Sequence, residues 1–151
     1  MHENFKTILV TTDFSESGDH AVEHAFRMAA DHGAEVVLCH IVEMIVAPNP
    51  LYAQYYPSDL LSPEIQQRAE QDAQKALRDR VPKDDALAKV PYTTLVLHGL
   101  PADEIIRAAQ TRDVDLIVIA THGRTGLKHL FMGSTAERVI RHVRCPVLVV
   151  R

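Results

Sequence analysis

The sequence has few cysteines, no long apolar run and no excess of basic residues, and each absence excludes a class of protein. Two cysteines in 151 residues, Cys39 and Cys145, are too few for a disulfide framework. Both lie in apolar, strand-like runs, where we expect buried, reduced thiols. No apolar stretch approaches the roughly 20 residues of a membrane helix, and residues 1–5 lack the apolar core of a signal sequence. We therefore expect a cytoplasmic protein without membrane insertion.

The charge balance is slightly acidic. Sixteen lysines and arginines against 20 acidic residues give a net charge of −4, whereas nucleic-acid binding usually requires a basic excess. The 46% of hydrophobic and 24% of charged residues are ordinary globular values, and the length suits one domain. We expect a single domain over residues 1–151 that does not bind nucleic acid.

Strand-like and helix-like segments alternate along the whole chain. Short β-branched or continuous apolar runs predict strands at residues 6–12, 35–42, 92–98, 115–121 and 146–151. Apolar residues at helical spacing predict helices from residues 13–18 to Gly33, from Ser62-Pro63 onward, at 102–109 and at 134–143. This alternation requires parallel pairing with right-handed crossovers. We expect an α/β fold with one doubly wound, five-stranded parallel sheet and helices on both faces.

Residues 43–62 interrupt this alternation. The segment holds three of the eight prolines and three of the four tyrosines. A connection of this length inside a compact domain is unusual and often functional. Two interpretations stay open: a lid or partner contact, and a loop that only folds its own side chains onto the surface.

The sequence lacks both standard nucleotide-binding fingerprints. There is no G-x-x-x-x-G-K-[ST] phosphate loop and no G-x-G-x-x-G dinucleotide turn. Open parallel sheets nevertheless bind ligands outside the carboxyl ends of their strands, near the point where the winding reverses. Two strand ends carry polar residues here: Asp13 follows the first strand, and residues 120–134 follow the fourth.

The segment 120–134 combines glycines with the start of a helix. Gly123 and Gly126 allow the backbone to approach a ligand closely, and Arg124 and Lys128 add positive charge. Gly133-Ser134 opens the last helix, where free N–H groups and the helix dipole favour an anion such as phosphate. The alternative is a capping box, in which Ser134 and the glutamate three residues later only cap the helix.

Four segments in order resemble the universal stress protein family over the whole chain. They are T-I-L-V-T-T-D-F-S-E at 7–16, G-L-P-A-D-E-I-I at 99–106, D-L-I-V-I-A-T-H-G-R-T-G-L at 115–127 and C-P-V-L-V-V at 145–150. The resemblance implies a Rossmann-like fold, similar to the adenine nucleotide alpha hydrolases. It also implies homodimerisation through the last strand, Pro146 to Val150, which is a short apolar edge.

The ATP-binding branch of this family carries glycine, two residues, glycine, nine residues, then glycine and serine or threonine. These positions are Ala120, Gly123, Gly133 and Ser134 here, so alanine replaces the first glycine. The resemblance implies that backbone N–H groups bind the phosphates of ATP. Asp13 would lie near the ribose and a phosphate-bound Mg²⁺, and Ile41 near adenine. The implied nucleotide-binding residues are Thr12, Asp13, Ile41, Ala120, His122, Gly123, Arg124, Gly133, Ser134 and Thr135.

Three functions follow from this resemblance. The first is an ATP-binding regulatory module of the stress response, and the second is an ATP-free homodimeric interaction protein, because the family includes members that do not bind ATP. The third is a slow ATPase. We expect no dedicated catalytic residue, since no base with an orienting partner is evident. We also expect no protein metal site, because His20 and His24 have no third ligand nearby in the sequence.

Overall fold

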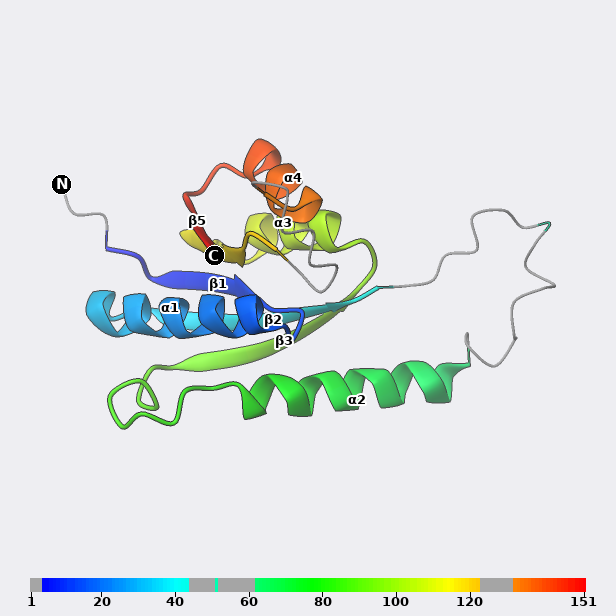
Figure 1. The fold of residues 1–151 in the computed structure, drawn as a ribbon, viewed down its shortest axis with the longest axis horizontal. Helices are drawn as coiled ribbons and strands as arrows, with labels where there is room; N and C mark the ends of the chain where they lie inside the picture. The colour runs from blue at the N-terminus through cyan, green and yellow to red at the C-terminus, as the bar shows by residue number, and fades with distance from the viewer. Residues whose placement is uncertain (1–3, 44–50, 52–61, 123–131) are drawn as a thin grey trace.

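The computed structural model of the chain describes residues 4–43, 51, 62–122 and 132–151. In this part of the chain, strands and α-helices alternate as predicted (Figure 1). Every predicted strand is confirmed to within one residue at each end. The elements are β1 Thr7–Thr11, α1 Glu16–His32, β2 Glu35–Val42, α2 Pro63–Asp79, β3 Tyr92–His98, α3 Pro101–Thr111, β4 Leu116–Ala120, α4 Ser134–His142 and β5 Val147–Val150.

All five strands pair in parallel in one sheet, in the order β3-β2-β1-β4-β5. The chain winds outward from β1 to β3, then returns to the other side of β1 for β4 and β5. The winding therefore reverses between β1 and β4, which is where ligands bind in open parallel sheets. β5 forms one edge of the sheet and β3 the other.

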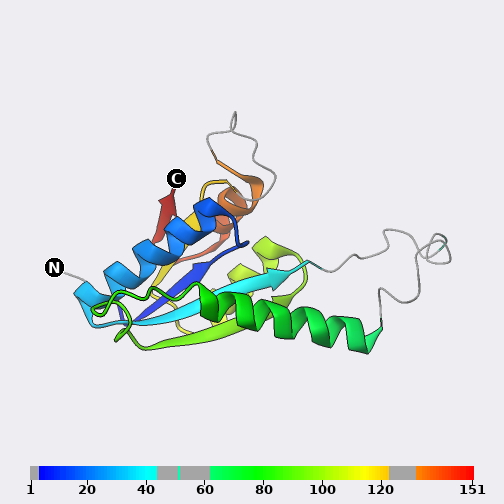
Figure 2. The ribbon, with the colours of Figure 1, turned by 60° about the horizontal axis from the view of Figure 1, so that its bottom comes forward.

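Helices cover both faces of the sheet (Figure 2). One core cluster joins α1 and α2 to alternate residues of the strands, such as Ile8, Leu38 and Val118. The other cluster joins α3 and α4 to the residues between them, such as Leu9 and Ile117. Because side chains alternate across a strand, the nearly continuous apolar runs in the sequence supply both faces. The α/β fold with a doubly wound parallel sheet is thus confirmed.

Helix ends follow the predicted signals at α1 and α2. Ser15 caps α1, Gly33 ends it with a left-handed backbone, and Ser62 caps α2 ahead of Pro63. Residues 44–50 and 52–61 of the proline- and tyrosine-rich segment lie outside the described residues, so neither interpretation of that segment is tested. No described helix is long and apolar enough to span a membrane.

The capping box, the alternative that the sequence left open at the start of α4, is not formed. The N-cap residue is Gly133, with an extended backbone at φ −69° and ψ 156°, and among the described residues no side chain makes a capping hydrogen bond to the first turn. Ser134 is the first helical residue, one position too late for its hydroxyl to reach back over the helix start. The first turn of α4 therefore keeps backbone N–H groups without a partner from the helix itself.

Candidate functional site

A cavity of about 660 Å³ opens at the carboxyl edge of the sheet, where the winding reverses. The ends of β1, β2 and β4 form its floor, and the first turns of α3 and α4 stand at its side. Its volume suits a small organic ligand. The lining residues are Thr11, Thr12, Asp13, Gly18, His40, Ile41, Val42, Glu43, Pro101, Ile105, Ile119, Ala120, Thr121, His122, Gly133, Ser134, Thr135 and Ala136.

One side of this cavity is apolar. Ile41 at the end of β2, Ile119 in β4 and Ile105 in α3 belong to the same core cluster and are at most 8% exposed. Pro101 lies beside them at the start of α3. Such a surface can accept a flat apolar ring, while polar groups at the rim fix the orientation of the ligand.

The start of α4 forms another part of the cavity wall. Ser134, Thr135 and Ala136 lie in its first turn and line the cavity. In any α-helix, the N–H groups of the first turn have no intrahelical acceptor, and the helix dipole adds a partial positive charge there. None of the described side chains caps this turn, so an anion in the cavity can accept these hydrogen bonds.

The other helix starts around the cavity suit an anion less well. The hydroxyl of Ser15 already accepts a hydrogen bond from the N–H of Gly18 in α1, over 3.1 Å. The first turn of α3 carries two carboxylates, Asp103 and Glu104, whereas that of α4 carries one, Glu137, which pairs with Arg141 of the same helix. Among the helices that line the cavity, α4 is therefore the best site for negative charge.

Gly133 is held against the end of β4. Its N–H donates to the carbonyl oxygen of Thr121 over 2.6 Å. A Cβ added at this position would lie only 2.9 Å from the same oxygen, so a side chain would force the two segments apart. That N–H is therefore already used within the protein, whereas Ser134 and Thr135 are the next residues that line the cavity. Glycine is required at this position because the backbones at Gly133 and Thr121 approach each other too closely for a side chain.

Ala120 occupies the end of β4, where the family motif has its first glycine. Its methyl group packs against the core cluster on the α1 side of the sheet and is partly buried there. The apolar side of the cavity is built by residues of the opposite cluster, such as Ile119. The methyl group is thus directed mainly into the protein core, although Ala120 still contributes to the cavity wall.

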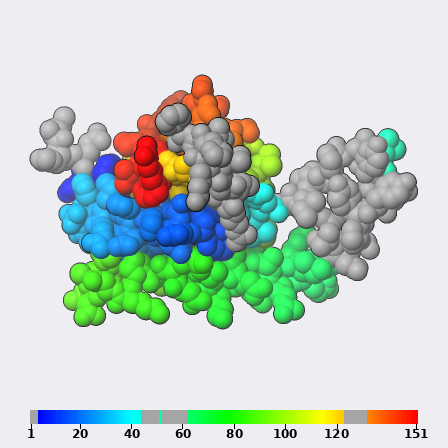
Figure 3. Space-filling view, viewed as in Figure 1, coloured from blue at the N-terminus to red at the C-terminus, as the bar shows by residue number. Residues whose placement is uncertain are grey.

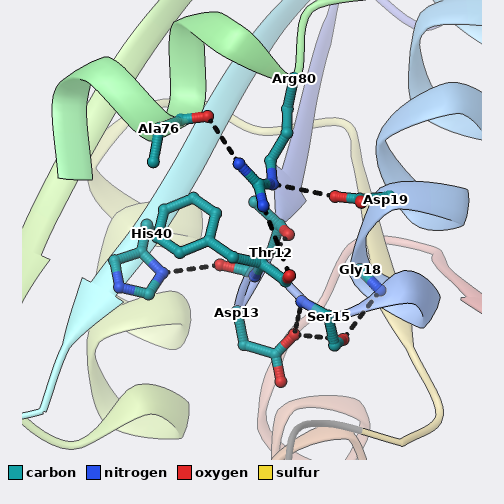
Figure 4. Close-up of polar contacts among 9 residues, drawn as sticks. Thr12, Asp13, Ser15, Gly18, Asp19, His40, Ala76 and Arg80 are labelled. Carbon is teal, nitrogen blue, oxygen red and sulfur yellow. Dashed lines mark hydrogen bonds and ion pairs between the residues drawn. The ribbon is translucent and has the colours of Figure 1, made fainter. Parts of the chain in front are cut away.

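The loop from Thr12 to Ser15 presents Asp13 to the cavity. The Thr12 N–H donates to the carbonyl oxygen of Cys39 over 3.0 Å, and the Thr12 hydroxyl accepts from the Phe14 N–H over 3.0 Å. Asp13 Oδ1 accepts the Ser15 N–H over 3.0 Å and a short hydrogen bond from the Ser15 hydroxyl (Figure 4). These bonds fix the orientation of the carboxylate at the end of β1.

The structure brings most of the predicted site residues into this one cavity. The predicted residues that line it are Thr12, Asp13, Ile41, Ala120, His122, Gly133, Ser134 and Thr135. Gly123 and Arg124 lie outside the described residues. The sequence did not identify Pro101, Ile105 and Ile119 as lining residues, because their spacing indicates only a helix start and core positions.

Neither cysteine is an activated nucleophile. Burial raises the pKa of the Cys39 thiol to about 12, and burial also raises the pKa of the Cys145 thiol. Both are free cysteines; Cys39 is buried as predicted, whereas the prediction of burial is wrong for Cys145, which precedes β5 and is only partly buried. Within residues 4–43, 51, 62–122 and 132–151, no three His, Cys, Asp or Glu side chains form a group that could hold a metal ion.

Comparisons with known proteins agree with this architecture. The model of the Universal stress protein family matches residues 4–151. A universal stress protein of Methanocaldococcus jannaschii is 35% identical over 147 residues, which cover 97% of this chain and 82% of that protein. The solved structure of universal stress protein UspA from Lactobacillus plantarum is 25% identical, with a TM-score of 0.82 over 99% of this chain and 100% of that chain.

Two more distant structures of universal stress proteins contain nucleotides. One is a complex with cAMP, 21% identical, with a TM-score of 0.67 over 99% of this chain and 98% of that chain. The other, from Archaeoglobus fulgidus, is a complex with dAMP, 20% identical, with a TM-score of 0.59 over 99% of this chain and 100% of that chain. At these identities the two structures show the shared fold. With the family match over nearly its full length, the chain belongs to the universal stress protein family.

Proposed function

We propose that this chain binds ATP in the cavity at the carboxyl edge of the sheet and acts as a nucleotide-dependent regulatory module in the stress response. The observation that carries the proposal is the uncapped first turn of α4, which lines the same cavity as the apolar residues Ile41, Ile105 and Ile119. This pairing of an anion site with an apolar slot suits a nucleotide. Other members of the family bind adenine nucleotides, cAMP and dAMP, which supports the same ligand class here.

In this proposal the adenine base and the phosphates of ATP occupy different parts of the cavity. Adenine lies against the isoleucine side chains, and backbone groups of Ile41 contact its edge. The phosphates accept hydrogen bonds from the N–H groups of Ser134 and Thr135, and Asp13 lies near the ribose. Gly123, Arg124 and His122 complete the proposed phosphate side. The direction of the Ala120 methyl group into the core supports binding despite the missing glycine.

Mg²⁺ is proposed to enter the site on the phosphates. In this proposal phosphate oxygens and water supply most of its ligands, as is usual for Mg²⁺ bound with a nucleotide. Asp13 is the carboxylate at the end of β1 that could add one oxygen. Mg²⁺ would then bind together with ATP and would not need a separate metal site made of protein side chains.

The backbone role of α4 is tested by replacing Ser134 in two ways. Ser134→Pro removes one N–H donor, and proline is well tolerated at the first position of a helix after an extended residue such as Gly133. Ser134→Ala removes only the hydroxyl. Calorimetry should show Mg-ATP binding weakened roughly tenfold or more by Ser134→Pro, the cost of a charge-assisted hydrogen bond. Ser134→Ala should stay within a factor of about three.

The results separate the functions that the sequence left open. Wild-type protein that shows no saturable Mg-ATP binding would favour the ATP-free interaction protein. Equal losses for both Ser134 variants would assign the contact to the hydroxyl instead of the backbone. ATP turnover above the rate in buffer would favour the slow ATPase.

We also propose a homodimer that pairs through Pro146 to Val150, and a cytoplasmic location. The dimer is supported by the position of β5 at the edge of the sheet, where no described strand pairs with its outer side. The C-terminal segment lies at the molecular surface, in red in Figure 3. The location is supported by the two free cysteines, which are typical of a reducing compartment.

A further inference from the structure

Phe14 has an unusual backbone conformation in the loop that presents Asp13 to the cavity. It follows Asp13 directly and has a φ of +66°, in the left-handed region that bulky residues avoid. Such a conformation persists only where the surrounding structure enforces it, and it often marks a functional site. The contacts of Phe14 therefore show what holds the loop that presents Asp13.

The Phe14 ring contacts two side chains from different elements. It stacks with the His40 ring of β2, with centroids 4.2 Å apart and planes inclined by 27°. The guanidinium of Arg80 lies 4.5 Å from the centroid of the same ring, within the range of a cation–π contact. We name His40, Phe14 and Arg80 the Phe14 clamp.

The other two members of the Phe14 clamp also hold the backbone of the loop. His40 Nδ1 lies 2.8 Å from the carbonyl oxygen of Thr12, so this nitrogen carries the proton and donates it. Arg80 donates to the carbonyl oxygen of Phe14 over 3.4 Å. The residues on either side of Asp13 are thus each tied to the clamp.

Arg80 is fixed by further contacts at the C-terminal end of α2. Its guanidinium donates to Asp19 of α1 over 3.0 Å and to the carbonyl oxygen of Ala76 over 3.2 Å (Figure 4). The side chain is 27% exposed, and an ion pair this close to solvent usually adds little stability. The Arg80 guanidinium has several partners at once, and this arrangement is suited to holding the loop after β1 in a fixed geometry.

We infer that Arg80 is a positioning residue of the nucleotide site, acting through Phe14 to hold Asp13 in its binding orientation. The inference rests on the proposed function. Arg80 does not line the cavity and touches no proposed ligand group. It links α2, which packs on β2 and β3, to the loop at the end of β1 where the winding of the sheet reverses.

The test compares Arg80→Gln with Arg78→Gln. Arg78 is an exposed arginine two residues earlier, and its side chain forms no hydrogen bond or ion pair with the described residues. The dissociation constant of Mg-ATP is measured by calorimetry at a temperature at which all variants are folded. Arg80→Gln should raise it roughly tenfold, as expected when a binding group is misplaced by a fraction of an ångström. Arg78→Gln should leave it unchanged, and Arg80→Lys should restore part of the loss.

A double-mutant cycle with Asp13→Asn separates positioning from general destabilisation. If Arg80 acts through Asp13, Arg80→Gln should cost much less in the Asp13→Asn background than in the wild type. Equal losses in both backgrounds, or equal affinities of Arg80→Gln and Arg78→Gln, would overturn the inference while leaving ATP binding intact. Absence of Mg-ATP binding by the wild type would instead overturn the proposed function on which the inference rests.

Discussion

Gly133 and Ser134 illustrate what a single residue contributes to this site. The motif spacing identified both positions, but it could not assign their roles. The amide of Gly133 is directed to Thr121 because two segments far apart in the sequence meet there, and no local pattern encodes that contact. The sequence left open whether Ser134 only caps the helix, and the extended backbone of Gly133 makes the glycine the cap residue. The residue types thus predicted where the candidate site lies, whereas tertiary contacts determine which backbone N–H groups are free to contact a ligand there.

Cys39 predicts a pH dependence of stability. Burial raises its pKa from the ordinary 9.0 to about 12, so the folded state keeps the proton between these values while the unfolded state releases it. The free energy of unfolding should therefore be unaffected by this thiol below pH 9 and should fall above it. The expected slope is at most about 1.4 kcal/mol per pH unit.

The comparison with Cys39→Ala isolates this effect. Urea unfolding of both proteins between pH 8 and 11 should show the wild type losing stability more steeply than the variant. Lysines and tyrosines also titrate in this range, but they are common to both proteins and cancel in the difference. Parallel curves would show that the thiol is not protected by burial.

The strands and helices were easier to predict from the sequence than the contacts between them. Strands read from apolar runs were placed to within one residue because the sheet is covered on both faces and each strand is almost uniformly apolar. The end of α1 at Gly33 and the starts at Ser15 and Ser62 followed from local chemistry. The side-chain contacts between elements, such as Arg80 with Phe14, carried no sequence signal because they join distant parts of the chain.

The two serine caps should differ in their effect on binding. Ser15 caps α1 over 3.1 Å and also fixes Asp13, whereas Ser62 caps α2 over 3.3 Å and does not line the cavity. Either serine replaced by alanine should lower stability by about 1 kcal/mol, the usual value of a cap. Only Ser15→Ala should also weaken Mg-ATP binding.

Thermal unfolding and calorimetry on the same samples measure both quantities. Similar melting temperatures with different dissociation constants would agree with a local role of Ser15 at Asp13. If Ser62→Ala weakened binding as much as Ser15→Ala, the effect would reflect helix stability alone.

At the scale of the whole molecule, the edge strand β5 is the surface proposed to pair with a second copy of the chain. The carbonyl groups of Pro146 and Val150 accept hydrogen bonds from β4, at 3.0 and 2.7 Å. Backbone groups alternate in direction along a strand, so the N–H groups of Val147 and Val149 point away from β4. The edge that the homodimer proposal requires is therefore available along β5.

Val149→Pro should convert the proposed dimer into a monomer. Proline removes the outward N–H without breaking a bond to β4, and it is tolerated on edge strands. Val149→Thr keeps the N–H and serves as the control. Light scattering should give twice the chain mass for the wild type and for Val149→Thr, and the single-chain mass for Val149→Pro. A wild-type monomer would contradict the dimer, and a dimeric Val149→Pro would place the interface elsewhere.

The hydrogen bond between Gly133 and Thr121 has a consequence for how this protein can vary. It joins Thr121, the residue after β4, to Gly133, the N-cap residue of α4, so the sheet itself locates the start of the helix. The entropic cost of closing a loop rises only slowly with loop length. The number of residues between Thr121 and Gly133 can therefore change while the first turn of α4 keeps its place beside the sheet. Relatives of this chain can differ in length there and still share the same helix start.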